Sequence, residues 1–90
     1  MNSHTKIKII GHPNGYLIKL NPEKTILWKK DGSFYLGGWK NECKNGLGFE
    51  VKPMRHKYKG YFVDGKRHGK GQIKSIDGTR YFGDWINGKK

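Results

Sequence analysis

The sequence has a single cysteine and no long hydrophobic run. Cys43 cannot form a disulfide within the chain, which fits a reducing compartment such as the cytosol. No apolar stretch approaches the length of a transmembrane helix. Residues 1–6 contain neither a signal-peptide core nor the Gly at position 2 that myristoylation requires. We therefore expect a cytoplasmic protein.

Acidic residues are also scarce: 7 Asp and Glu stand against 19 Lys and Arg, for a formal net charge of +12. The excess is greatest between residues 52 and 74, where Asp64 is the only acidic residue. Such a stretch is either a solvated face or an anion-binding surface. The candidates for binding an anion or an acidic lipid are Lys57, Lys59, Lys66, Arg67, Lys70 and Lys74.

Groups that carry catalysis do not gather in this sequence. Cys43, His56 and His68 lack the spacing of metal ligands. The segment Gly69-Lys-Gly71 resembles a phosphate-binding loop only superficially, because no helical pattern and no Lys-Ser/Thr follow it. No nucleophile with a base beside it can be named. We expect no enzymatic activity, no cofactor and no metal.

What the sequence does contain is a repeat. Tyr35, Tyr58 and Tyr81 each begin a copy of one pattern, since 58 − 35 and 81 − 58 both equal 23. A fixed period of this size indicates a repeat architecture. The copies read Tyr35-Leu-Gly37-Gly-Trp39, Tyr58-Lys-Gly60-Tyr-Phe62 and Tyr81-Phe-Gly83-Asp-Trp85, and Gly46-Leu-Gly48 of the first recurs as Gly69-Lys-Gly71 of the second.

Each copy reads as a β-hairpin. Its aromatic residues alternate with other residues at period two, as in a strand with unlike faces. Turn signals follow the strands at residues 41–42, 64–65 and 87–88. Asp64-Gly65 and Asn87-Gly88 favour type I′ turns because Gly readily adopts positive φ. A return strand then runs through Gly-x-Gly to a second turn such as Asp77-Gly78. We predict an all-β, single-layer antiparallel meander of hairpins.

The middle glycine of each copy shares a strand face with two rings and has no side chain to hold them away. The rings can therefore lie over bare backbone. We expect them to stack between copies, Tyr with Tyr and Trp or Phe with Trp or Phe. Packing in the core is the commoner role of such rings, and lining a partner-binding groove is the alternative. The six residues are Tyr35, Trp39, Tyr58, Phe62, Tyr81 and Trp85.

Residues 1–34 are predicted to cap the array. They contain a strand at residues 6–10 and a degenerate repeat in which Tyr16, 19 residues before Tyr35, begins the first strand. Its return strand is predicted at residues 25–28, and Asp31-Gly32 matches Asp77-Gly78. Atypical terminal units are typical caps of repeat arrays. The predicted units are residues 1–34, 35–57, 58–80 and a partial 81–90, all in one structural domain.

The second copy resembles a MORN (membrane occupation and recognition nexus) repeat. The first departs at Glu42, where Gly is usual, and the third is half present. The resemblance implies a twisted half-pipe. Similar repeats occur in junctophilins, plant phosphatidylinositol phosphate kinases, a SET-domain lysine methyltransferase and cytoskeletal adaptors. They are usually non-catalytic scaffolds that bind proteins, and they have been linked to anionic phospholipids. The residues that carry the resemblance are Tyr58, Gly60, Phe62, Gly65, Gly69, Gly71, Asp77 and Gly78.

Three functions are therefore open. The first is a scaffold that binds a partner protein in its groove or at a sheet edge near residues 81–86, where a homodimer could also form. The second is binding of the basic residues to an acidic phospholipid surface, which would place the protein at a membrane. A scaffold could instead be cytosolic or associated with the cytoskeleton. The third is nucleic-acid binding, which ranks last because no nucleic-acid motif is present.

Overall fold

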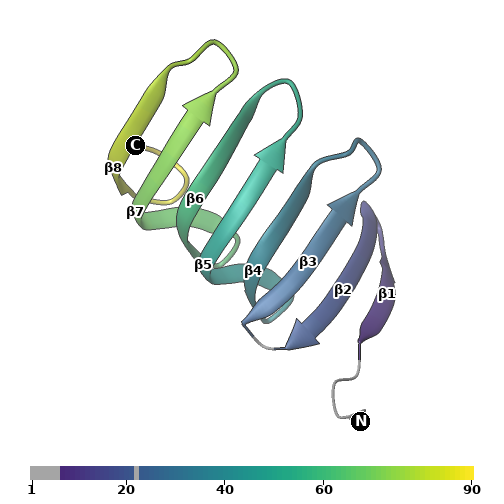
Figure 1. Ribbon diagram of the computed structural model, residues 1–90. Coiled ribbons are helices and arrows are strands. Elements are labelled where there is room, and N and C mark those ends of the chain that lie inside the picture. Colours follow the sequence, from purple (N-terminus) through teal and green to yellow (C-terminus); the bar gives the residue numbers. More distant parts are fainter. Residues whose placement is uncertain (1–6, 22) are drawn as a thin grey trace, which may run out of the picture.

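The computed structural model describes residues 7–21 and 23–90, which form one curved antiparallel sheet (Figure 1). Its eight strands lie side by side in chain order, and the described residues contain no helix. The molecule is 44 Å long. This confirms the predicted single-layer meander. The strands are β1 (Lys8–His12), β2 (Gly15–Asn21), β3 (Lys24–Lys29), β4 (Phe34–Lys40), β5 (Cys43–Lys52), β6 (His56–Val63), β7 (Lys66–Ser75) and β8 (Arg80–Trp85).

The turns follow the sequence signals. Asp64 and Gly65 have φ values of 50° and 84°, and Asn87 and Gly88 have 49° and 86°, as type I′ turns require. The turn at residues 41–42 also has two positive φ values, although it contains no glycine. The predicted strand at residues 6–10 corresponds to β1. Lys6, predicted to begin that strand, and Pro22, predicted to lie in a turn, are outside the described residues.

A row of glycines crosses the sheet. Each glycine pairs with the glycine of the next strand, from β4 to β8. No side chain rises from the sheet along this line, so a shallow channel of bare backbone is left for rings to fill. The members of the row are Gly37, Gly48, Gly60, Gly71 and Gly83.

Tyrosine rings fill this channel. A Cβ atom on Gly71 would lie 2.1 Å from the hydroxyl oxygen of Tyr58, and one on Gly48 would lie 2.4 Å from a ring carbon of Tyr35. The hydroxyl of Tyr58 reaches across to donate a hydrogen bond to the carbonyl oxygen of Tyr61, 3.0 Å away. Glycine is therefore required here for space, as the sequence predicted.

Bulges in β5 and β7 contribute to the bend of the sheet. Residues 45–47 of β5 lie opposite Gly38 alone, and residues 68–70 of β7 lie opposite Tyr61 alone. The first glycine of each Gly-x-Gly, Gly46 or Gly69, sits in this bulge with φ of 90° or 80°. Bulges bend a strand and increase its twist, so they contribute to the half-pipe.

The prediction of two separate ring ladders is wrong. Tyr35 and Tyr58 are two strands apart, with Glu50 between them in the register. That separation is about 9.6 Å, which exceeds the reach of an aromatic pair. Tyr35 and Tyr58 instead each meet the Phe or Trp of the next copy nearly edge-on. The rings form one zigzag: Trp39–Tyr35 (6.3 Å between centroids), Tyr35–Phe62 (5.2 Å), Phe62–Tyr58 (5.1 Å), Tyr58–Trp85 (5.3 Å) and Trp85–Tyr81 (5.5 Å).

The prediction that Tyr16 takes the place of Tyr35 is also wrong. Leu17, which is buried, pairs with Leu27, and Leu27 pairs with Tyr35. Leu17 therefore continues the inner row, and Tyr16 points to the opposite face with 60% of its surface exposed. A shift of one residue moves every side chain of a strand to the other face.

Candidate functional site

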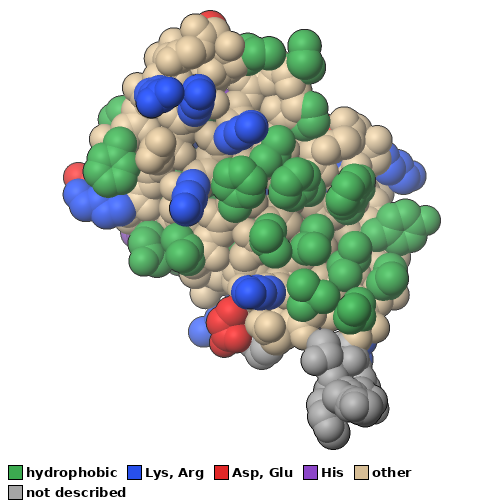
Figure 2. Space-filling view, viewed as in Figure 1, with side chains coloured by type: hydrophobic (Ala, Val, Ile, Leu, Met, Phe, Trp, Pro, Cys, Tyr) green, Lys and Arg blue, Asp and Glu red, His purple; other side chains and the backbone are tan. Residues whose placement is uncertain are grey.

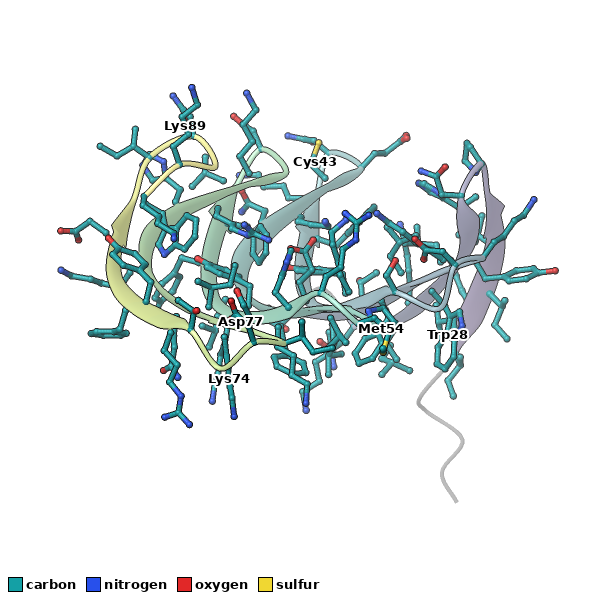
Figure 3. The ribbon with its side chains drawn as sticks, turned by 90° about the horizontal axis from the view of Figure 1, so that it is seen from above. Trp28, Cys43, Met54, Lys74, Asp77 and Lys89 are labelled. Atoms are coloured by element: carbon teal, nitrogen blue, oxygen red, sulfur yellow. The ribbon has the colours of Figure 1, made fainter. Side chains whose placement is uncertain are left out.

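The curvature gives the sheet two unlike faces (Figure 3). The side chains of Trp28 and Lys74 point from the outer side of the curve, whereas Cys43 and Lys89 lie at hairpin ends on the opposite side. The inner face holds the ring zigzag, and we call this concave face the groove. Each face is a candidate binding surface.

The rings beneath the groove are almost completely buried. Tyr35, Tyr58, Phe62 and Trp85 are at most 3% exposed, whereas Trp39 and Tyr81 are only partly buried. Burial raises the pKa of Tyr35 to about 12. Because four of the six rings are covered, their main contribution is to the core.

Three cations lie above these rings. The Nζ atom of Lys44 is 5.5 Å from the centroid of Tyr35, and the guanidinium of Arg67 is 5.0 Å from that of Tyr58. The Nζ atom of Lys90 is 5.2 Å from the centroid of Tyr81. These distances are within the range of cation–π attraction. A molecule entering the groove therefore meets positive charge before it meets aromatic carbon.

Glu50 is the one buried carboxylate among the described residues, at 7% exposure. It forms an ion pair with Lys44, and its other oxygen accepts a hydrogen bond from Nη2 of Arg67 at 3.2 Å. Burial acts to raise the pKa of Glu50, but the bonds and charges of Lys44 and Arg67 outweigh it, so this pKa lies below its usual value. The same guanidinium nitrogen lies 2.8 Å from Nε2 of His56.

Cations outnumber carboxylates on the inner face. Burial, followed by the nearby charges of Lys44 and Lys52, lowers the pKa of Lys29. Neither Lys29 nor Lys52 forms an ion pair within the part of the chain that the structure describes. The groove therefore keeps positive charge that Glu50 does not neutralise.

The outer face carries an extensive apolar surface on β1–β6, which we call the outer apolar patch (Figure 2). Two rows cross the strands: Tyr16 pairs with Trp28, and Ile26 with Leu36. The rings of Trp28 and Phe34 stack at 6.0 Å. Trp28 remains 54% exposed. The patch contains Ile9, Tyr16, Ile18, Ile26, Trp28, Phe34, Leu36, Leu47, Phe49, Val51 and Tyr61.

On β6 both of these outer rows continue with a lysine. Val51 pairs with Lys57, and Phe49 pairs with Lys59. Lys57 in turn pairs with Lys74. Figure 2 shows the apolar side chains mostly over the N-terminal half of the sheet and the Lys and Arg side chains mostly toward the C-terminal half. The outer face thus places an apolar surface directly beside a basic one.

Two other kinds of site have no support in the described residues. No three His, Cys, Asp or Glu side chains come close enough to hold a metal ion. Residues 7–21 and 23–90 contain no helix long and apolar enough to span a membrane.

A family model described as the MORN repeat matches residues 58–80 and 81–90. These two segments begin at Tyr58 and Tyr81, and they carry the hairpins whose rings and glycines are described above. The chain is a MORN repeat protein. No curated protein matches it. MORN repeats are generally non-enzymatic and serve as binding scaffolds.

The six basic residues predicted to bind an anion do not form one surface in this MORN repeat protein. Lys57, Lys59 and Lys74 share the outer face, while Arg67 lies in the groove beside Glu50. Lys70 bonds to Asp84 at 2.7 Å, and Lys66 is an exposed residue at the start of β7. Alternation along β7 separates these side chains, and their role in binding stays a prediction.

Two features of the MORN repeat surfaces were missed from the sequence. The cations above the rings, Lys44, Arg67 and Lys90, repeat with the period of the rings, since 67 − 44 and 90 − 67 both equal 23. The sequence contains this signal, but only Arg67 of the three is among the candidates for binding an anion that were named from the charge pattern. The outer apolar patch was missed because the alternate positions of each strand, such as Leu36 and Phe49, were not followed across the sheet.

The environment of His56 makes stability depend on pH. Burial, and then the adjacent charge of Arg67, lowers the pKa of His56 below its usual 6.5, although Glu50 acts in the opposite direction. The unfolded chain therefore binds a proton more readily than the folded protein, so stability falls as the pH drops below about 6.5. We expect a lower urea midpoint at pH 5.5 than at pH 7.5. His56→Gln should reduce this difference, and an unchanged difference would contradict the assignment.

Proposed function

We propose that this MORN repeat protein is a non-catalytic scaffold that binds a partner protein. The outer apolar patch is the observation that supports this best. Monomeric proteins rarely expose contiguous apolar patches larger than a few hundred Å², and larger ones mark interaction sites. Trp28 is more than half exposed and is of the residue type that most often anchors an interface. Leu47, also more than half exposed, adds apolar area beside it.

The charges beside the patch indicate the chemistry of the partner. Lys57, Lys59 and Lys74 continue the apolar rows, and the described part of the outer face carries few carboxylates to oppose them. A complementary surface would have an apolar centre flanked on one side by Asp or Glu. Such an arrangement would fix the orientation of the partner and speed its association.

The groove and the sheet edges are further surfaces for the same role. β1 and β8 are the outermost strands of the described sheet, so each has one side on which no described strand pairs. A partner strand added to β8 would gain main-chain hydrogen bonds. If that strand came from a second copy, the product would be a homodimer, which light scattering detects as a doubled mass.

The test is affinity capture from a lysate at about 150 mM salt, where exposed charges are screened beyond ~8 Å. The baits are the wild type, a Trp28→Ser/Leu47→Ser variant of the patch, and an Ile76→Ser/Ile86→Ser control. All four side chains are exposed, so the fold should survive each change. We expect a defined partner protein on the wild-type and control baits, with a loss of at least about tenfold on the patch variant. Equal retention by all three baits would remove the patch from the proposal.

The second candidate is an acidic phospholipid surface, favoured by the position of the basic residues beside exposed Trp28 on one face. Lys57→Glu/Lys59→Glu/Lys74→Glu should then abolish pelleting with vesicles that contain phosphatidylserine. Pelleting of the wild type together with capture of no partner protein would replace the first function with this one and place the protein at membranes. Wild-type protein that does not pellet would remove the lipid candidate.

A further inference from the structure

Glu50 lies between two cations, and the repeat places a second pair of cations one period later. Lys44 and Arg67 hold Glu50 between them on the inner face. One period later the corresponding cations are Arg67 and Lys90, and the corresponding middle residue is Ile73, since 73 − 50 equals 23. At the position in the second unit that corresponds to Glu50, the carboxylate is therefore replaced by an apolar side chain.

The register places Ile73 as the structural equivalent of Glu50. Glu50 lies between Tyr35 and Tyr58 in the inner row, and Ile73 lies between Tyr58 and Tyr81. Ile73 packs against the ring zigzag, but it is only partly buried, whereas Glu50 is buried. The position is therefore reachable from the groove.

Each cation of the second pair lies over an aromatic ring, as each cation of the first does. Arg67 lies 5.2 Å from the centroid of Trp85, and Lys90 lies 5.2 Å from that of Tyr81. The contact between Arg67 and Glu50 uses Nη2 alone, whereas a guanidinium has five N–H donors. Lys90 has no ion pair within residues 7–21 and 23–90. Donors thus remain available on both sides of Ile73.

We propose that Arg67 and Lys90 form a clamp above Ile73 that binds a carboxylate from an acidic segment of a partner protein lying in the groove. The first clamp, occupied by Glu50, shows which ligand this arrangement accepts. Lys29 and Lys52 extend the positive charge of the groove beyond the clamps, which suits a segment with several Asp or Glu residues better than a single small anion. The inference rests on the proposed scaffold function and names the chemistry of one of its surfaces.

The first test follows the wild-type protein by NMR during titration with a blocked hexaglutamate peptide at about 50 mM salt, where the Debye length is ~14 Å. We expect the largest shifts at the side-chain N–H groups of Arg67 and the methyl groups of Ile73. A hexaglutamine peptide should cause none. Acetate at the same carboxylate concentration separates a small anion from a segment, and we expect it to bind more weakly. Shifts centred on Lys57 and Lys59 of the outer face would overturn the clamp.

Matched variants of the exposed C-terminal lysines test the same clamp without disturbing the core. Lys90→Gln should weaken hexaglutamate binding by about fivefold, as expected for the loss of one charged contact. Lys89→Gln makes the same change of charge but lies beyond the ring of Tyr81, and it should weaken binding by less than about twofold. Equal effects of the two substitutions would show only a general response to charge and would overturn the clamp.

Ile73→Glu supplies the missing carboxylate from within the chain. It should fill the clamp as Glu50 fills the first and reduce hexaglutamate binding at least about tenfold, whereas Ile76→Glu, an exposed control of equal charge, should not. Equal binding by these variants would overturn the proposal. The outer apolar patch is unchanged in Ile73→Glu. If the wild-type protein captures a partner through Trp28 but does not bind hexaglutamate, the clamp is rejected and the scaffold function is retained.

Discussion

Gly71→Ala is expected to lower the free energy of unfolding by about 3 kcal/mol. The added Cβ would lie 2.1 Å from the hydroxyl oxygen of Tyr58 and 2.5 Å from two of its ring carbons. Tyr58 has no exposed surface, and Phe62 and Trp85 pack against its ring at 5.1 and 5.3 Å, so it has no room to withdraw. Overpacking of this kind costs about 1–3 kcal/mol, and loss of the buried tyrosine hydrogen bond adds about 1 kcal/mol.

Urea denaturation followed by tryptophan fluorescence measures the effect, because Trp85 packs against Tyr58. Gly11→Ala is the matched control: it is a strand glycine in β1 whose added Cβ would meet no atom within 4 Å. Its unfolding free energy should stay within about 0.5 kcal/mol of the wild type. Similar midpoints for the two alanine variants would contradict the view that glycine is needed beneath the ring for space.

The second large effect is expected from Tyr58→Ala, which should cost about 3–5 kcal/mol. The change removes a fully buried ring that contacts Phe62 and Trp85 and lies under the guanidinium of Arg67. It also leaves a cavity above bare glycine backbone, which has no side chain to collapse into the space. For a domain of this size such a loss approaches the whole stability.

Tyr61→Ala is the comparison for this ring. Tyr61 lies three residues further along the same strand, but its side chain is on the outer face and 50% exposed. We expect a loss below about 1 kcal/mol, and Tyr58→Phe, which removes only the hydroxyl, should cost about 1 kcal/mol. The measurement is the urea midpoint of each variant. A Tyr61 variant as unstable as the Tyr58 variant would show that burial in the zigzag does not set the cost.

Most of the fold could be predicted because it repeats. The period of 23 locates the hairpins, and the residue types of turn pairs such as Asp64-Gly65 predict their backbone geometry. Errors arose where the pattern was not local. Tyr16-Leu17-Ile18 is apolar throughout, so alternation cannot say which residue faces inward, and the ring of Tyr16 misled the assignment. Only the pairing of Leu17 with Leu27 decides it.

The candidate surfaces were harder to predict for a related reason. Whether rings meet depends on how many strands separate them, and period alone does not give that number. Glu50 lies between Tyr35 and Tyr58 in the register. The two tyrosine rings are therefore too far apart to stack, and the rings form one zigzag instead of the two predicted ladders. Likewise, Lys44 reads as one of many lysines until the pairing of strands brings it beside Glu50. Composition shows that the protein is positively charged, whereas the strand register shows where the charged side chains lie.

Every strand of this sheet pairs only with the strands next to it in the chain. Strand pairing within the described sheet therefore does not depend on segments far apart in the chain, so loop closure costs little entropy. Folding can start at any hairpin and spread along the array. The same arrangement makes the length of the molecule adjustable. A 23-residue unit can be inserted or deleted while each remaining unit keeps a neighbour of the same kind, so the reach of the surface can change without a redesign of its interior.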